Sequence, residues 1–140
     1  MTPPPGEHRG VLDTSTVILL SQLADTTGLP DEPTITTVTL AELSVGPLVA
    51  RTDSERAARQ AHLQQAEADF EPLPFDEAAA RAFGRVAADL RNSGRKTSAR
   101  AYDALIAATA IANGLAIHTA NPDDFTGIEQ LTVIPVPHPS

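Results

Sequence analysis

Residues 101–120 read AYDALIAATAIANGLAIHTA, and this stretch decides the fold. The part from Ala99 to Asn113 is rich in alanine and isoleucine, which predicts a helix that is apolar nearly all round and ends at Gly114. The apolar run from Leu115 to Thr119 then predicts a buried strand. A buried helix that leads directly into a buried strand is typical of α/β folds with a mostly parallel sheet.

Strands and helices alternate along the rest of the chain. The predicted strands are Gly10 to Asp13, Thr34 to Val38, Glu71 to Pro74, Leu115 to Thr119 and Leu131 to Pro135. The predicted helices are Thr16 to Ala24, Leu40 to Ala50, Thr52 to Ala68, Asp76 to Ser93 and Ala99 to Asn113. The prolines allow the strand from Glu71 only at an edge of the sheet. We expect one domain over residues 1–140, with irregular segments at 1–9 and 136–140.

Composition narrows the function classes. The chain has 140 residues, enough for one core and too few for two ordinary domains. Because it contains no cysteine, disulfide frameworks, thiolate zinc sites and cysteine nucleophiles are excluded. No apolar stretch reaches the roughly 20 residues that a membrane span needs, and the first residues lack the apolar region of a secretory signal. We therefore expect a cytoplasmic protein that does not bind a membrane.

The charges are unevenly distributed. The net charge of −8 argues against a protein that binds nucleic acid over its whole surface. Six of the ten basic residues lie between Arg81 and Arg100, and no Lys or Arg follows Arg100. For Arg81 and Arg85 the ordinary interpretation is the solvated face of an amphipathic helix. The acidic residues pose the sharper question, because carboxylates that surround a cleft repel one another unless a cation lies between them.

Acidic residues follow or precede several predicted strands at one edge of the sheet. Asp13 ends the first strand, Glu42 lies in the first turn of the helix after the second, and Asn121 to Asp124 follow the strand that ends at Thr119. The helix that contains Asp103 runs antiparallel to the strand after it, so its first turns begin at the same edge. Ligands of such sheets gather beyond the carboxyl ends of the strands. The topology therefore predicts four carboxylates from four segments at one site.

Each of these residues also has an ordinary interpretation. Asp103 could interact with the helix dipole or with Arg100, although it lies past the first turn if Thr97 or Ser98 caps the helix. A carboxylate at a buried helix costs several kcal/mol unless it is hydrogen-bonded, paired or bound to a metal. Thr39 and Glu42 match a capping box.

Asp13 could cap the helix that follows it, and the run Asn121 to Asp124 could be a solvated turn. Individually these signals are weak, and their conjunction carries the prediction. An oxygen-rich pocket of this kind suits Mg²⁺ or Mn²⁺, which activate water for attack on a phosphodiester. Histidine ligands are not expected, because His8, His62, His118 and His138 are scattered and His118 lies in a predicted strand as a packed side chain.

The chain resembles the PIN-domain ribonucleases, specifically the VapC toxins of bacterial VapBC toxin–antitoxin systems. The motifs that carry the resemblance are VLDTS at 11–15, TLAEL at 39–43 followed by Gly46, YDALIAATA at 102–110 and TANPDDF at 119–125. In this order and spacing they are specific, and they span nearly the whole chain. The resemblance implies a PIN-like three-layer α/β/α sandwich with a mostly parallel sheet of four to five strands.

It also implies a metal-dependent endoribonuclease that cleaves tRNA or rRNA with Mg²⁺, or Mn²⁺, as cofactor. The implied catalytic residues and metal ligands are Asp13, Glu42, Asp103 and Asp124, with Glu42 binding the metal directly or through water. The implied supporting polar residues are Thr14, Ser15, Thr119, Asn121 and Asp123. Asp124 is preferred over Asp123 by alignment to the motif. Ala120 departs from the family, which often has a basic residue there.

The resemblance implies a homodimer that is neutralised by a VapB-type antitoxin, whose basic tail would occupy the acidic groove, and higher toxin–antitoxin assemblies are compatible with it. The candidates for contacts with the RNA backbone are Arg91, Arg95, Lys96 and Arg100.

A PIN-like module that binds RNA or protein without cleaving is the alternative. An aspartyl-phosphate phosphatase is disfavoured, because Ser15 stands where that site needs a second acid and Lys96 is the only lysine. No glycine pattern of a P-loop or a dinucleotide-binding fold occurs.

Overall fold

The computed structural model of the chain describes residues 9–96 and 100–139. Its sheet has four parallel strands in the order β2-β1-β3-β4. The strands are β1 (Arg9–Leu12), β2 (Glu32–Thr34), β3 (Ile117–Thr119) and β4 (Val133–Pro135). The predicted parallel α/β architecture is confirmed. The predicted irregular lead-in lies outside the described residues except for Arg9, which begins β1, and residues 136–139 have no regular secondary structure.

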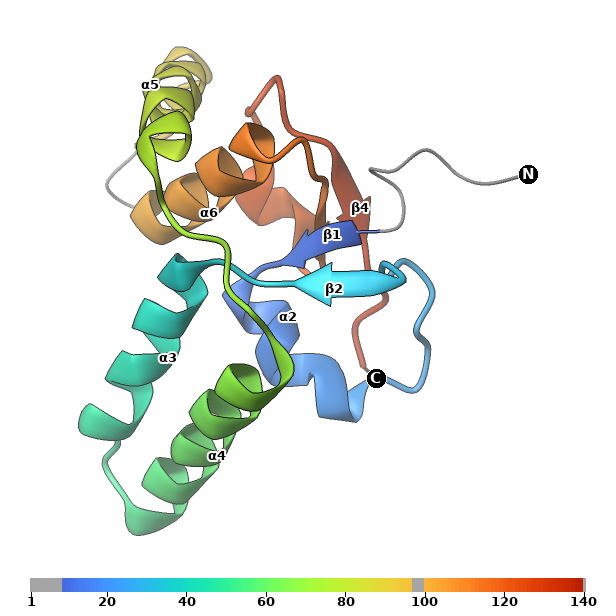
Figure 1. The fold of residues 1–140 in the computed structure, drawn as a ribbon, viewed down its shortest axis with the longest axis vertical. Helices are drawn as coiled ribbons and strands as arrows, with labels where there is room; N and C mark the ends of the chain where they lie inside the picture. The colour runs from blue at the N-terminus through green and yellow to red at the C-terminus, as the bar shows by residue number, and fades with distance from the viewer. Residues whose placement is uncertain (1–8, 97–99, 140) are drawn as a thin grey trace.

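Helices cover both faces of the sheet, which gives the expected three layers (Figure 1). The α-helices of the described part are α2 (Thr14–Leu19), α3 (Thr37–Leu48), α4 (Asp53–Asp69), α5 (Glu77–Asn92) and α6 (Ala101–Ala112). Two 3-10 helices, η1 (Leu20–Gln22) and η3 (Pro122–Phe125), follow α2 and β3. α5 and α6 pack together on one face, and α3 and α4 pack together with α2 on the other. In the described part, no helix is long and apolar enough to cross a membrane.

The sheet has a hydrophobic core on each face, and successive side chains of β1 point into one core and then the other. Val11 belongs to the cluster formed with α5, α6 and η3, whereas Leu12 belongs to the cluster formed with α2, α3 and α4. Both side chains are fully buried, as expected for a strand with helices on each face. Helix α6 contributes most to the first cluster, because six of its residues between Ala104 and Ala110 are buried.

The second strand ends earlier than the predicted range of Thr34 to Val38. It stops at Thr34, because Thr36 caps α3 by accepting a hydrogen bond from the Thr39 amide at 3.3 Å. Strand propensity of β-branched residues is weak and yields to such a cap. Thr39 is therefore not the N-cap, so the alternative interpretation of Thr39 and Glu42 as a capping box does not hold, and Glu42 lies in the second turn of the helix in place of the predicted first turn.

Several further boundaries differ from the prediction. α2 spans Thr14–Leu19 in place of Thr16 to Ala24, and α3 spans Thr37–Leu48 in place of Leu40 to Ala50. Leu73 forms only an isolated bridge with Thr36, in place of a strand from Glu71 to Pro74, because proline on each side removes the amides that would extend the pairing. Arg100 occupies the N-cap position of α6, so Asp103 lies in the first turn of that helix. The alternative caps Thr97 and Ser98 lie outside the described residues.

Two glycines offer a matched test of this packing. A Cβ at Gly10 in β1 would overlap the His118 ring and approach Pro30, whereas a Cβ at Gly84 in α5 would meet open space. We expect Gly10→Ala to lower the free energy of unfolding by about 1–3 kcal/mol or more, because the core is overpacked. Gly84→Ala should raise it by about 0.5–1 kcal/mol through helix propensity. Urea unfolding of both variants checks this, and equal effects would contradict the described packing.

Candidate active site

The four predicted acids lie at the carboxyl edge of the sheet. Asp13 follows β1 directly and Asp124 lies in η3 after β3, while Glu42 and Asp103 lie near the starts of α3 and α6. Figure 1 shows the arrowheads of β1 and β2 directed towards the edge at which α3 and α6 begin. The parallel arrangement thus brings together segments that are far apart in sequence.

Asp13 is the most buried of the four, with 2% of its surface exposed. It occupies the N-cap position of α2, but its carboxylate accepts hydrogen bonds from the hydroxyls of Thr16 and Ser15, the latter at 3.0 Å. Burial raises the pKa of Asp13, and the hydroxyls of Thr16, Ser15 and Thr119 oppose that rise. These donors fix the orientation of a carboxylate that has almost no contact with solvent.

Glu42 is held by a chain of hydroxyl groups. The Thr14 hydroxyl donates to Glu42 Oε1 at 2.6 Å and lies 3.0 Å from the hydroxyl of Thr39. Because Thr14 has one hydroxyl proton and gives it to Glu42, Thr39 is the donor to Thr14. Burial raises the pKa of Glu42 and the nearby charge of Asp13 raises it further, while the Thr14 hydrogen bond lowers it.

Asp103 shows most clearly that the acids converge. Its pKa is raised to about 6, first by burial and then by the charges of Asp124, Asp13 and Glu42. Arg100 opposes this rise: its guanidinium lies 3.9 Å from Asp103 Oδ2 and donates to Asp124 Oδ1 at 2.7 Å. Arg100, proposed from the sequence as a contact for the RNA backbone, is thus a counter-charge within the acidic site in this structure.

The supporting polar residues connect β3 and the turn after it to the start of α2. The Asn121 side-chain amide donates to Ser15 Oγ at 2.9 Å, and the Asn121 backbone amide donates to Thr119 Oγ1 at 2.9 Å. The Ala120 amide donates to Thr16 Oγ1 at 3.0 Å. Asp123 is exposed, and its backbone carbonyl accepts from Arg95 Nη1 at 3.3 Å.

Sequence reasoning missed Thr16 as a part of the site. The residue is fully buried and contacts both Asp13 and the Ala120 amide. The signal was present in the run Thr14-Ser15-Thr16, because three consecutive hydroxyl residues after an acid at a strand end are well placed to bind it. By contrast, His118 is the packed histidine that was predicted, with Nδ1 2.5 Å from the carbonyl of Gly28.

The site offers the oxygen ligands that a hard divalent cation needs. Three of its carboxyl groups have raised pKa values through burial, and Glu42 and Asp103 also through mutual repulsion, which a bound cation would relieve. In the described residues, no group of three acidic, histidine or cysteine side chains is arranged to hold a metal ion as it stands. The Arg100 guanidinium supplies positive charge beside two of the carboxylates, those of Asp103 and Asp124.

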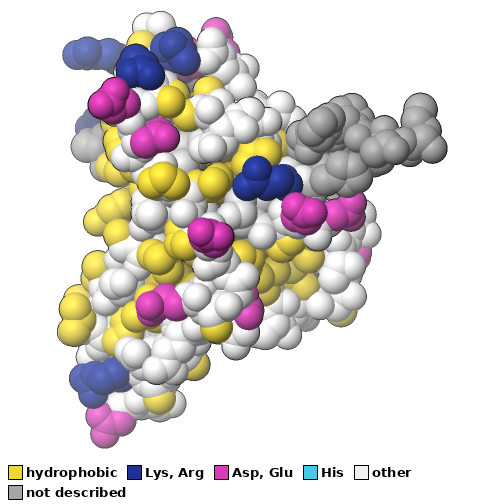
Figure 2. Space-filling model, viewed as in Figure 1, with side chains coloured by type: hydrophobic (Ala, Val, Ile, Leu, Met, Phe, Trp, Pro, Cys, Tyr) yellow, Lys and Arg dark blue, Asp and Glu magenta, His cyan; other side chains and the backbone are white. Residues whose placement is uncertain are grey.

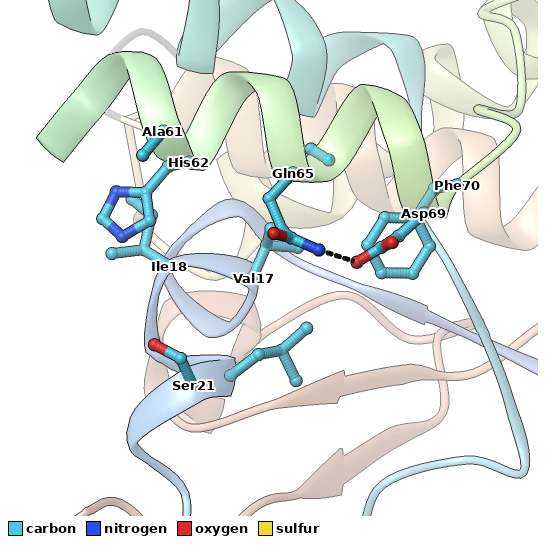
Figure 3. Close-up of a pocket in the computed structure, with 10 residues that line it drawn as sticks. Val17, Ile18, Ser21, Ala61, His62, Gln65, Asp69 and Phe70 are labelled. Carbon is cyan, nitrogen blue, oxygen red and sulfur yellow. Dashed lines mark hydrogen bonds between the residues drawn. The ribbon is translucent and has the colours of Figure 1, made fainter. Parts of the chain in front are cut away.

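A hollow lies between α2 and α4 and is separate from the four acids (Figure 3). Its lining is largely apolar and includes Val17, Ile18 and Phe70. His62 borders it, and Gln65 donates to Asp69 at 2.6 Å along the same helix. Because none of the four acids lines this hollow, it does not contribute to the carboxylate chemistry.

Comparison with known proteins places these observations in context. The PIN domain family model matches residues 11–129, a range that contains all four acids. Ribonuclease VapC5 of Mycobacterium tuberculosis is 43% identical over 122 residues, which cover 86% of this chain and 87% of the relative. Ribonuclease VapC4 of the same organism is 37% identical over 102 residues, which cover 73% and 75% of the two chains.

Solved structures agree with this match. The crystal structure of VapBC-5 from Mycobacterium tuberculosis, a toxin–antitoxin system, aligns with a TM-score of 0.77 and 40% identity over 92% of this chain and 99% of that one. The structure of VapBC2 from Rickettsia felis bound to a promoter DNA fragment has the same fold, with a TM-score of 0.68 at 21% identity over 89% and 96% of the two chains.

Repulsion at the site can be tested through Asp103. Its native pKa of about 6 lies above the reference value of 3.8, so the folded chain binds this proton more readily than the unfolded chain does. The protonated Asp103 carboxyl group therefore stabilises the fold fully below about pH 4. This stabilisation is lost as the pH rises through about 6, where the group ionises in the folded chain. Asp103→Asn should therefore raise the free energy of unfolding of the metal-free protein by about 1–3 kcal/mol at pH 7.5, with little gain near pH 4.

Urea unfolding in EDTA at several pH values measures this difference. The control is Asp53→Asn, because Asp53 is fully exposed at the start of α4. It should give no gain at any pH. A stability difference for Asp103→Asn that does not change with pH would contradict the repulsion described for this carboxyl group.

Proposed function

Because the chain belongs to the PIN-domain family, and within it to the VapC ribonucleases, we propose that it is a divalent-metal-dependent endoribonuclease that acts as the toxin of a toxin–antitoxin pair. The observation that supports this proposal is the placement of the four acids at the carboxyl edge of the sheet, where the Arg100 guanidinium lies 3.9 Å from Asp103 Oδ2 and 2.7 Å from Asp124 Oδ1. The cofactor we propose is Mg²⁺, with Mn²⁺ as a substitute, because both prefer oxygen ligands.

Each acid has a distinct place in the proposed site. Asp13, Asp103 and Asp124 would hold the metal directly, and Glu42 would hold it directly or through water. The bound cation would acidify a water molecule and neutralise charge on the phosphodiester. The hydroxyls of Ser15 and Thr16 keep the Asp13 carboxylate in one orientation, and Thr14 does the same for Glu42. Such pre-orientation matters because a misplacement of about 1 Å is costly to catalysis.

A non-cleaving binding module explains the site less well. Burial raises the pKa of three of the carboxyl groups, those of Asp13, Glu42 and Asp103, and such burial costs free energy. A module that only binds RNA or protein does not need this costly arrangement, whereas a metal-dependent nuclease does. The substrate class we propose is tRNA or rRNA, in the cytoplasm.

The proposed partner is a VapB-type antitoxin. The proposal is supported by the similar structure VapBC-5, which is described as a member of the VapBC family of toxin–antitoxin systems. The acidic edge favours a basic tail, whose arginine would pair with carboxylates such as Asp124, as Arg100 does within the chain. We also propose that the chain forms a homodimer.

The nuclease proposal predicts metal-dependent cleavage of RNA. Purified, antitoxin-free protein should cut total cellular RNA at discrete positions with Mg²⁺ or Mn²⁺ and not with EDTA. Asp13→Ala and Asp103→Ala should each lower the rate at least about 100-fold, because each removes a metal ligand. Asp53→Ala, at an exposed acid on α4, should cleave at the normal rate. Equal activity in all variants would indicate a contaminating nuclease, and a folded, metal-binding protein that leaves RNA intact would overturn the proposal.

The partner proposal predicts a stable complex with the product of the neighbouring small reading frame. Co-expression should yield one species in size-exclusion chromatography, and the complex should not cleave RNA. Removing the basic tail of the antitoxin should restore cleavage if that tail occupies the acidic edge. Failure to form a complex, together with no rescue of growth, would contradict the toxin–antitoxin assignment of this chain.

A further inference from the structure

A basic hollow lies at the C-terminal end of α5, next to the acidic site. It is lined by Arg91, Asn92, Arg95 and Lys96 together with the small residues Gly84, Ala87 and Ala88. We call this surface the α5 hollow. Figure 2 shows several Lys and Arg side chains, with acidic side chains among them, at the end of the molecule where α5 lies. Such a concentration is notable in a chain with a net charge of −8.

The cations of the α5 hollow, Arg91, Arg95 and Lys96, form no ion pair with the carboxylates of residues 9–96 and 100–139. At the other end of the same helix, Arg81 lies 3.8 Å from Glu77. Three unpaired cations around one depression are complementary to an anion with several charges.

The backbone places these cations together. α5 ends in a Schellman motif, in which the Arg95 amide donates to the Leu90 carbonyl at 2.8 Å and the Gly94 amide donates to the Arg91 carbonyl at 3.1 Å. Gly94 makes this possible with a positive φ of 82°. The turn directs the chain back towards the last turn of the helix. Cations at a helix C-terminus also interact favourably with the helix dipole, but that effect is confined to stability.

The α5 hollow borders the acidic site through η3. Arg95 Nη1 donates to the carbonyl of Asp123, the residue before Asp124, at 3.3 Å. The segment after η3 is fastened to the same helix, because the Glu129 amide donates to Asp89 Oδ2 at 3.2 Å. A strand with one phosphate at the acidic edge therefore has cationic groups for its neighbouring phosphates on the α5 side.

We propose that the α5 hollow binds the phosphates of an RNA strand beside the scissile bond, with Arg91, Arg95 and Lys96 as the contacts. This inference rests on the nuclease function proposed above. It assigns the three residues to substrate binding and leaves the chemistry to the carboxylates. It also gives the strand a direction of exit from the site, along the C-terminal half of α5. The small side chains of the hollow leave room for a sugar or a base.

The test is direct binding of a labelled, mixed-sequence single-stranded RNA oligonucleotide in EDTA, where cleavage is not expected. The variant combines Arg91→Gln, Arg95→Gln and Lys96→Gln. The control combines Arg51→Gln, Arg56→Gln and Arg81→Gln, which removes the same charge from exposed positions elsewhere. We expect the first set to weaken binding at least about tenfold. It should also reduce the slope of log affinity against log salt by about 2, because each of the three lost phosphate contacts contributes about 0.7 to that slope. The control should stay within about twofold.

Cleavage kinetics separate this inference from the function on which it rests. With Mg²⁺, the α5 variant should show a raised KM and an unchanged kcat, because its carboxylates are intact. If the unsubstituted chain cleaves RNA and the α5 variant binds and cleaves like it, the inference is wrong and the nuclease function stands. If the unsubstituted chain neither binds nor cleaves RNA, both fail. Retained RNA binding with loss of binding to the antitoxin would reassign the α5 hollow to a protein partner.

A loss of folding is controlled in two ways. The thermal midpoint of the triple variant should lie within a few degrees of the unsubstituted chain, because Arg91 and Lys96 are exposed. The single change Arg91→Gln leaves the Arg95 contact with Asp123 in place and should still weaken RNA binding measurably. Normal binding by this folded single variant, together with unfolding of the triple variant, would overturn the inference.

Discussion

The burial of negative charge at the carboxyl edge of a parallel sheet is the constraint on which the rest of this structure depends. Asp13 is almost inaccessible to solvent, and the pKa of Asp103 responds to the three other carboxylates. Such groups destabilise a fold unless hydrogen bonds or cations offset their charge. The chain provides hydroxyl donors at residues 14–16 for two of the acids and the Arg100 guanidinium for the others. The strand order β2-β1-β3-β4 makes this compensation possible, because β1 and β3 are neighbours and the segments that follow them meet.

The hydroxyl groups join separate segments as well as satisfying the acids. Thr16 contacts Asp13 and the Ala120 amide, and Ser15 contacts Asp13 and the side chain of Asn121. The start of α2 is thereby tied to the turn that carries Asp124. A polar network of this kind is stabilising only when all of its members have partners, and no buried side-chain nitrogen or oxygen of the described residues lacks one. The geometry of the site is consequently determined by the fold itself, and the carboxylates remain available for a ligand of opposite charge.

The sequence was sufficient to predict the architecture, because the alternation of apolar strands with helices is set by burial on both faces of the sheet. It was also sufficient to predict the sheet edge at which the four acids lie, since their positions near strand ends and helix starts follow from the topology. It was insufficient where local interactions compete. The Thr36 cap shortened the second strand, because several threonines in that region could each have begun the helix. The contact of Arg100 with Asp103 was among the interpretations that the sequence offered, but its pairing with Asp124 was not, since that pairing joins side chains 24 residues apart in the chain.

The separation of charge along the chain now has a structural explanation. The cations of residues 91–96 and the acids of residues 103–124 are close in sequence, yet the end of α5 and the start of α6 place them on adjoining surfaces. A polyanion that met only the acidic edge would be repelled, and one that met only the basic hollow would bind without reacting. In the arrangement that we propose, the α5 hollow attracts an RNA strand that spans both surfaces. The strand is thereby brought to the carboxylates of the acidic edge, whose charge a bound cation would offset. A basic tail, by contrast, matches only the acidic edge. The two proposed ligands therefore compete at the carboxylates and differ at α5, so the affinity of RNA and the affinity of the antitoxin can be altered separately.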